Sequence, residues 1–349
     1  MKSANNIDKS NMRQVILDFP KQFQGGVEAA RKIDLSKYQN LRSPIVICGM
    51  GGSASVGDLL KVWLRHEYLG VSQFEVLIYR DYHFPKLERK EGVWEPLIVA
   101  ISYSGNTEEA LSAYEQAQKR QLPLVSMATG GKLKKFALRD GTPFIQIPKT
   151  GIQPRSSLGY QFGALVALLE KLGVFSHETN KVFELEHALM PERLEEAAKK
   201  IARTLADSIP LIYASAAWRE LAHIVKIKFN EHAKTPAFWN YFPELNHNEM
   251  TGFATQNQKR KTKYQKFHVL ILEDAGDHPR TKKRMRLTAK LLAKKGIRST
   301  LIPIKGKTIL QKIFTILLLG DWIAYYTAIL RGVDPTPVTM VEEFKRFLK

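Results

Sequence analysis

The sequence predicts an α/β fold: two successive doubly wound units, each a parallel sheet with helices on both faces, followed by a C-terminal helix. Short apolar runs rich in β-branched residues alternate with longer segments of helical periodicity. Such runs are typical of strands buried on both faces, as in parallel sheets. The alternation occurs twice along 349 residues, and roughly 150 residues per domain gives two domains. We expect domains at 1–175 and 176–349, with a charged connector around 172–195.

In the first half, short apolar runs place strands at 43–48, 74–79, 96–101, 122–127 and 143–147. Between them, helices are expected at 55–68, 107–119 and 158–172. The first of these helices has one apolar face, formed by Val56, Leu59, Leu60, Trp63 and Leu64. The second begins with Thr107, Glu108 and Glu109, a cap and two acids that suit the positive end of the helix dipole.

The second half repeats this plan, with strands at 210–214, 267–272 and 299–304 and helices at 216–229, 281–295 and 309–330. The aromatic segment after residue 232 is expected to be a loop. The run 309–330 is long and apolar but carries Gln311, Lys312 and Asp321, so we expect a buried or amphipathic helix rather than a membrane span. The C-terminal helix is short, with an apolar stripe of Val341, Phe344 and Leu348.

The charge and the cysteine content of the chain indicate which kinds of binding partner and which cellular compartment to expect. The formal net charge of +19 would attract nucleic acid, acidic lipid or small phosphorylated anions. The basic clusters at 259–263 and 282–286 have no zinc-finger or RNP motif beside them, so we expect no specific nucleic-acid partner and no membrane partner. The single cysteine, Cys48, excludes an internal disulfide framework and is expected to be a buried strand residue. We expect a cytoplasmic protein, because the N-terminus lacks the apolar segment of a signal peptide.

Two loops of small residues follow predicted strands, where ligands of open α/β sheets bind. The first offers the backbone amides of Gly51 and Gly52 and the hydroxyl of Ser53. The second offers three hydroxyls around a glycine, from Ser102, Ser104 and Thr107. Each loop precedes a helix, whose N-terminus favours an anion. Together they predict a phosphate site that needs no lysine.

The first loop also fits a loose dinucleotide-binding pattern, G-x-G-x-x-A, over residues 49–54. A nicotinamide site needs, in addition, an acid after the second strand to hold the ribose, and Asp81 stands there after Arg80. The second hydroxyl loop favours a phosphate site, because a dinucleotide site does not need a second loop of this kind. A nicotinamide oxidoreductase therefore stays a further hypothesis.

An acid and an imidazole lie either side of the aromatic segment. Glu231 and His247 are 247 − 231 = 16 residues apart. With a phosphate site upstream, a carboxylate and a histidine are the groups needed to move a proton on a phosphorylated sugar. The spacing of His232 and His247 does not match a His-Glu-x-x-His zinc site, and we expect no metal and no cofactor.

The second loop, Ser102 to Glu109, resembles the phosphate loop of sugar isomerase (SIS) domains. Three further blocks, at 49–53, 154–160 and 244–253, resemble in the same order the bifunctional phosphoglucose/phosphomannose isomerase family of bacteria and archaea. The resemblance implies two SIS-type units, each an αβα sandwich, and a cytoplasmic homodimer with a shared active site. It implies interconversion of glucose 6-phosphate or mannose 6-phosphate with fructose 6-phosphate through a cis-enediol.

The resemblance also implies a role for each site residue. Ser53, Ser102, Ser104 and Thr107 would hold the sugar phosphate. Glu231 would shuttle the proton between C1 and C2, and Arg155 would stabilise the enediolate. His247, from the partner subunit, and Lys345 would assist ring opening, with Lys349 as the alternative lysine.

Two departures and one alternative accompany this resemblance. Residue 232 is His where the family pattern has Asn, and Ser55-Val56-Gly57 replaces a more glycine-rich segment. SIS domains also occur in regulators that bind a phosphosugar without converting it. The residues before the first predicted strand, however, show no helix-turn-helix domain, and the joint presence of Glu231, His247 and Arg155 favours the enzyme.

Overall fold

The computed structural model describes residues 4–38, 44–68, 75–82, 95–174, 176–253 and 267–348. The chain forms two units. The first unit is Asp18–Leu189, and the second unit is Met190–Lys349 together with the N-terminal Met1–Leu17. These bounds differ from the predicted domains 1–175 and 176–349. The N-terminal residues 1–17 belong to the second unit, and residues 176–189 of the connector belong to the first.

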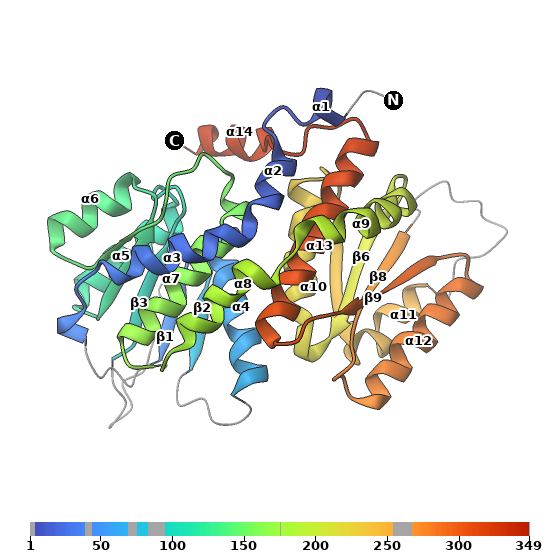
Figure 1. The fold of residues 1–349 in the computed structure, drawn as a ribbon, viewed down its shortest axis with the longest axis horizontal. Helices are drawn as coiled ribbons and strands as arrows, with labels where there is room; N and C mark the ends of the chain where they lie inside the picture. Colours follow the sequence, from blue (N-terminus) through green and yellow to red (C-terminus); the bar gives the residue numbers. More distant parts are fainter. Residues whose placement is uncertain are drawn as a thin grey trace. The chain divides into compact units, whose positions relative to one another are not determined.

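The first unit contains a five-stranded parallel sheet in the order β2-β1-β3-β4-β5 (Figure 1). All five predicted strands are present: β1 (Ile45–Cys48), β2 (Val76–Tyr79), β3 (Leu97–Ile101), β4 (Leu124–Ala128) and β5 (Phe144–Gln146). The chain passes from β1 outward to β2 and then returns to β3 on the other side of β1. The carboxyl ends of β1 and β3 therefore form the switch point of this sheet.

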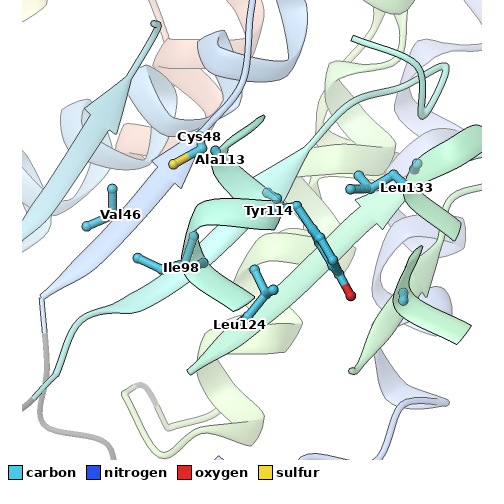
Figure 2. Close-up of a cluster of buried hydrophobic side chains, with 11 residues drawn as sticks. Val46, Cys48, Ile98, Ala113, Tyr114, Leu124 and Leu133 are labelled. Carbon is cyan, nitrogen blue, oxygen red and sulfur yellow. The ribbon is translucent and has the colours of Figure 1, made fainter. Parts of the chain in front are cut away.

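One face of this sheet is covered by α5 (Glu108–Lys119) and α6 (Gly131–Asp140). Figure 2 shows how Val46, Ile98 and Leu124 from neighbouring strands meet Tyr114 of α5 and Leu133 of α6. Cys48 lies in the same cluster, which confirms its predicted burial, and burial raises the pKa of its thiol to about 12. The sequence did not predict α6, which begins at the second glycine of the pair Gly130-Gly131.

The remaining helices of the first unit are α3 (Gln22–Arg31), α4 (Gly52–Glu67), α7 (Leu158–Lys171) and α8 (Glu178–Ala188). Gly57 of α4 lies so close to the sheet that an added Cβ would come within 2.9 Å of Ile78 and 3.1 Å of Ile47. The connector was predicted only as a charged segment, and α8 shows that it is largely helical. α4 begins three residues before the predicted helix, so Ser53 lies in its first turn.

The second unit contains a four-stranded parallel sheet in the order β7-β6-β8-β9. Its strands are β6 (Ile209–Ser215), β7 (Phe238–Phe242), β8 (Phe267–Asp274) and β9 (Arg298–Ile304). The prediction of a loop at the aromatic segment was wrong, because this segment forms the edge strand β7. Phe238 and Trp239 are exposed there while Phe242 is buried, so no continuous apolar run marks the strand.

The helices of the second unit are α1 (Ala4–Ile7), α2 (Met12–Leu17), α9 (Pro191–Leu205), α10 (Arg219–Glu231), α11 (Glu249–Gly252), α12 (Pro279–Lys294), α13 (Ile309–Leu330) and α14 (Thr339–Phe347). Among the described residues, α13 alone is long and apolar enough to cross a membrane, and 78% of its most apolar window is buried inside the protein. That burial fits the predicted core helix. The predicted helix 281–295 corresponds to α12, whereas the basic cluster at 259–263 lies outside the described residues.

Glu195 of α9 ties the N-terminal segment to the second unit. Arg13 donates to its two carboxylate oxygens at 3.0 and 2.8 Å, and the hydroxyl of Tyr326 on α13 also donates to it. Burial alone would raise the pKa of Glu195, but the bonds from Arg13 and Tyr326 outweigh burial and hold the pKa below its usual range. The carboxylate that joins these three elements is therefore ionised at neutral pH.

We predict that Glu195→Gln lowers the free energy of unfolding by about 1–2 kcal/mol at pH 7, because charge-assisted hydrogen bonds are lost and Arg13 is half exposed. The pKa of Glu195 is lower in the folded protein than in the unfolded chain. The stabilisation is therefore complete above the ordinary value of 4.5 and is lost as pH falls through the folded pKa. Urea unfolding of both proteins between pH 7 and pH values below this window measures the difference.

Glu196→Gln is the matched control, because its side chain is 75% exposed and its pairing with Lys199 should contribute little. A Glu195→Gln effect that persists undiminished at acid pH would contradict the role of the ionised carboxylate. Equal effects of the two substitutions would contradict it as well.

Candidate active site

The first predicted phosphate loop joins β1 to α4. Gly51 has a φ of 52°, in the left-handed region that favours glycine. Gly52 begins α4 and packs against the backbone at Pro154, because an added Cβ would lie 2.9 Å from the Pro154 carbonyl oxygen. Ser53 follows in the first turn of this 16-residue helix and is buried. The loop thus brings backbone N–H groups and a hydroxyl to the positive end of a long helix.

The second loop joins β3 to α5 and is organised by Ser102. The Ser102 Oγ accepts the N–H of Gly105 at 3.0 Å and that of Thr107 at 3.4 Å, and it lies 2.8 Å from the Thr107 Oγ1. Ser102 is buried, whereas Ser104 is exposed and Thr107 is half-buried. Ser102 therefore shapes the loop, and its more accessible neighbours present hydroxyls at its surface.

The structure brings the two loops together at the switch point of the sheet. The N–H of Tyr103 in the second loop donates to the Ser53 Oγ of the first at 3.1 Å. Gly105 has a φ of 72°, and a Cβ added there would lie 1.8 Å from the carbonyl oxygen of Gly130. The turn before α6 thus packs directly against the second loop.

Arg155 reaches the same region from a third segment. It lies in a short 3₁₀ helix, Pro154–Ser156, and only 2% of its surface is exposed. The Cα of Arg155 would be 3.1 Å from a Cβ at Gly52, so its backbone lies against the first loop. The six predicted phosphate-binding residues and Arg155 therefore gather in one region of the first unit.

Glu231 is the last residue of α10 and is half-buried. Because β6 and β7 are parallel, α10 must return the chain from the carboxyl end of β6 to the amino end of β7. Glu231 therefore lies at the amino-end edge of the second sheet. The ammonium group of Lys234 donates to the backbone carbonyl of Glu231 and, at 2.9 Å, to that of Pro335, which follows α13.

His247 lies at the opposite edge. It follows β7 and a short 3₁₀ helix, Glu244–Asn246, and its side chain is exposed. Five-residue β7 alone separates the two edges by roughly 15 Å. The second unit of one chain therefore does not bring Glu231 and His247 together.

Lys345 lies on α14, whose residues are all exposed, and Lys349 lies outside the described residues. The structure thus places Lys345 on a surface helix of the second unit. Within the described ranges, no group of three or more His, Cys, Asp or Glu side chains could hold a metal ion.

Sequence reasoning missed two polar clusters in the second unit. Glu249 accepts hydrogen bonds from the Tyr213 hydroxyl and from the Asn240 side-chain amide. Burial, together with the Glu249 charge, raises the pKa of Tyr213. The second cluster joins Asp321 of α13 to Lys228 of α10 and to His232, the C-cap of that helix. Its signal in the sequence was an acid inside the apolar run 309–330.

This chain is similar to known proteins in sequence and in fold. Residues 194–348 match the family model described as the bacterial phospho-glucose isomerase C-terminal SIS domain. The chain is 36% identical to the bifunctional phosphoglucose/phosphomannose isomerase of Caldicellulosiruptor bescii over 349 residues, covering 97% of this chain and 98% of that protein. It is 34% identical to the protein of the same name from Aquifex aeolicus, covering 90% and 92% of the two chains.

A solved structure shows the same fold. The C-terminal domain of glucosamine-fructose-6-phosphate aminotransferase from Francisella tularensis superposes with a TM-score of 0.65 at 16% identity, covering 93% of this chain and 98% of that one. Together with the family model and the two parallel sheets, this likeness confirms the predicted pair of SIS-type α/β units.

We predict that Gly105→Ala lowers the free energy of unfolding by about 2–4 kcal/mol, because it combines a left-handed backbone with a clash against Gly130. Gly141→Ala is the control: its φ is 63°, but nothing lies within 4 Å of an added Cβ, so only the backbone strain of about 1 kcal/mol remains. Chemical denaturation of both variants measures the two losses. Equal losses would show that the contact between the second loop and Gly130 does not constrain the site.

Proposed function

This chain belongs to the bifunctional phosphoglucose/phosphomannose isomerase family, and we propose that it interconverts glucose 6-phosphate and mannose 6-phosphate with fructose 6-phosphate. The observation that carries the choice of substrate class is the pair of linked hydroxyl loops at the first switch point. Backbone N–H groups, hydroxyls and two helix N-termini suit a phosphate, and the loops themselves contain no lysine or arginine.

We propose Glu231 as the base that removes the proton from C2 of the aldose and returns it to C1. A carboxylate suits this step, because both carbons carry the proton in turn and one group can serve them both. Loss of stereochemistry at C2 in the cis-enediol lets glucose and mannose phosphates share this base. Arg155, with its guanidinium charge, is proposed to stabilise the enediolate electrostatically.

Ring opening needs a proton to move from O1 to O5 before the enediol forms. We propose His247 and Lys345 for these transfers, since an imidazole and an amine can donate or accept near neutral pH when their surroundings allow it. The position of His247 bears on the assembly. His247 and Glu231 lie at opposite edges of the second sheet, which favours a homodimer in which His247 enters the site of the partner subunit.

The reaction also suggests a setting for the protein. The substrates are hexose phosphates of glycolysis and gluconeogenesis, and we propose that the protein acts there in the cytoplasm. A single buried cysteine is compatible with a reducing compartment.

We predict that proton NMR of fructose 6-phosphate with this protein in D₂O shows glucose and mannose 6-phosphates. Both should carry deuterium at C2, because the proton held by the base exchanges with solvent before it is returned. Glu231→Gln should lower turnover by about 10²–10⁴, because the amide cannot accept the proton. Binding of fructose 6-phosphate to this variant should persist, because the phosphate loops are unchanged.

Other outcomes distinguish the alternatives. Glucose 6-phosphate alone would keep the enediol mechanism and narrow the substrate. Saturable binding without conversion would favour a sugar-phosphate-binding regulator. Substantial turnover by Glu231→Gln would remove Glu231 from the role of base.

We predict that Glu231→Gln and His247→Ala chains complement each other if the site is shared. Each variant alone should be nearly inactive. A randomly paired 1:1 population should regain about a quarter of wild-type activity, because about half of its dimers are mixed and each mixed dimer has one intact site of two; mixed dimers purified on both tags should regain about half. Co-expression with two different affinity tags, followed by activity assays and light scattering, measures this. The control pairs Glu231→Gln with the Glu231→Gln/His247→Ala double variant, which cannot rebuild a site. Absence of complementation in a verified mixed dimer would contradict the shared site.

A further inference from the structure

Three ionisable side chains are buried together beside Glu231. Lys228 is 1% exposed, His232 is 0% exposed and Asp321 is 5% exposed. The Lys228 Nζ and the His232 Nε2 each lie 2.9 Å from the same Oδ1 of Asp321. Lys228 lies in the last turn of α10 and His232 is the C-cap residue one turn later, and the backbone N–H of His232 donates to the Lys228 carbonyl at 2.8 Å. Asp321 therefore bonds one residue of the last turn of α10 and the C-cap residue that follows the helix.

The packing of the two helices places this carboxylate. Gly320, immediately before Asp321, faces Val225 of α10, and a Cβ added at Gly320 would lie 3.1 Å from a Val225 methyl group. α10 and α13 thus approach closely at the point where Asp321 reaches Lys228 and His232. A side chain at 320 would require Val225 to shift by a few tenths of an ångström.

Such a cluster contributes little net stability to the fold. Burying ionised groups carries a desolvation penalty of several kcal/mol per ion, and well-packed apolar residues of the same volume often give an equally stable fold. What a buried ion cluster specifies is geometry, because its members keep their partners only in one arrangement of the helices.

The protonation of the cluster follows from its contacts. Burial alone would raise the pKa of Asp321, but the charge of Lys228 and the hydrogen bond from His232 keep that pKa below its usual range. An ionised carboxylate only accepts hydrogen bonds, so the Nε2 of His232 carries the proton that it shares with Asp321.

We propose that the Asp321–His232 pair, supported by Lys228, is the positioning device for Glu231, an inference that rests on the proposed function. His232 follows Glu231 directly and is the C-cap of α10, where a helix end would otherwise fray. Lys234 holds the Glu231 carbonyl from the other side. The backbone of Glu231 is thus fixed on both sides, by α13 and by the segment that follows it.

The test compares two substitutions of His232. In His232→Leu the hydrogen bond to Asp321 is lost, and kcat for fructose 6-phosphate should fall about 10- to 100-fold with KM changed less than about threefold, because the base is displaced while the phosphate loops are intact. In His232→Gln the amide N–H can replace the Nε2–H donor, and kcat should stay within about threefold of wild type. His187→Leu, at an exposed position on α8, is the control and should retain wild-type kcat.

The outcomes separate this inference from the proposed function. A folded His232→Leu protein with wild-type kcat would overturn the positioning role, while the isomerase activity would stand. Wild-type protein without isomerase activity would overturn both. Equal losses in His232→Leu and His232→Gln would also overturn the role of the hydrogen bond. If His232→Leu does not fold, Asp321→Glu is the second test, since this substitution keeps the charge and moves the carboxylate by one methylene. We expect kcat to fall at constant KM. Wild-type kcat in Asp321→Glu would overturn the inference.

Discussion

The direction of the parallel strands is the constraint on which the proposed chemistry depends. In a parallel sheet every strand ends at the same edge, and each connecting helix must carry the chain back to the opposite edge. The loops after β1 and β3 therefore lie side by side, with two helix N-termini behind them. The same rule places Glu231, at the end of a returning helix, at the other edge of its own sheet. The phosphate loops thus lie at the carboxyl-end edge of the first sheet, whereas the proposed base lies at the amino-end edge of the second sheet.

The two sheets share this topology, but the residues at their switch points differ. At the first, the strand ends lead to hydroxyls and glycines. At the second, β8 ends at Asp274, and Asp277 follows; both are buried, and the Asp274 N–H donates to the Asp277 carboxylate at 3.0 Å. Lys312 pairs with Asp274 at 2.8 Å. The second switch point thus presents carboxylates, which accept hydrogen bonds, whereas the first presents the hydroxyl and backbone N–H donors that a phosphate needs.

Sequence patterns predicted what depends on neighbours along the chain. Buried strands such as β1 and β3 are continuous apolar runs, and the hydroxyl loops follow them directly. β7 was missed because an edge strand with exposed Phe238 and Trp239 has no such run. The contact between Asp321 and His232 joins positions 89 residues apart, and the pairing of two helices cannot be read from either one. The separation of Glu231 from His247 likewise needed β7 to be recognised as a strand.

The excess positive charge is not carried by the loops that are proposed to bind phosphate, which contain no lysine or arginine. α12 alone carries seven Lys and Arg among its 16 residues and no acid, at the cost of repulsion between like charges one turn apart. The phosphate loops use neutral donors instead, so their hydrogen bonds depend on geometry and fall off within a few ångströms. A net charge of +19 acts over about a Debye length and raises the local concentration of any small anion. Attraction and recognition are thus carried by different residues, because long-range attraction needs net charge whereas selection among phosphosugars needs fixed donors.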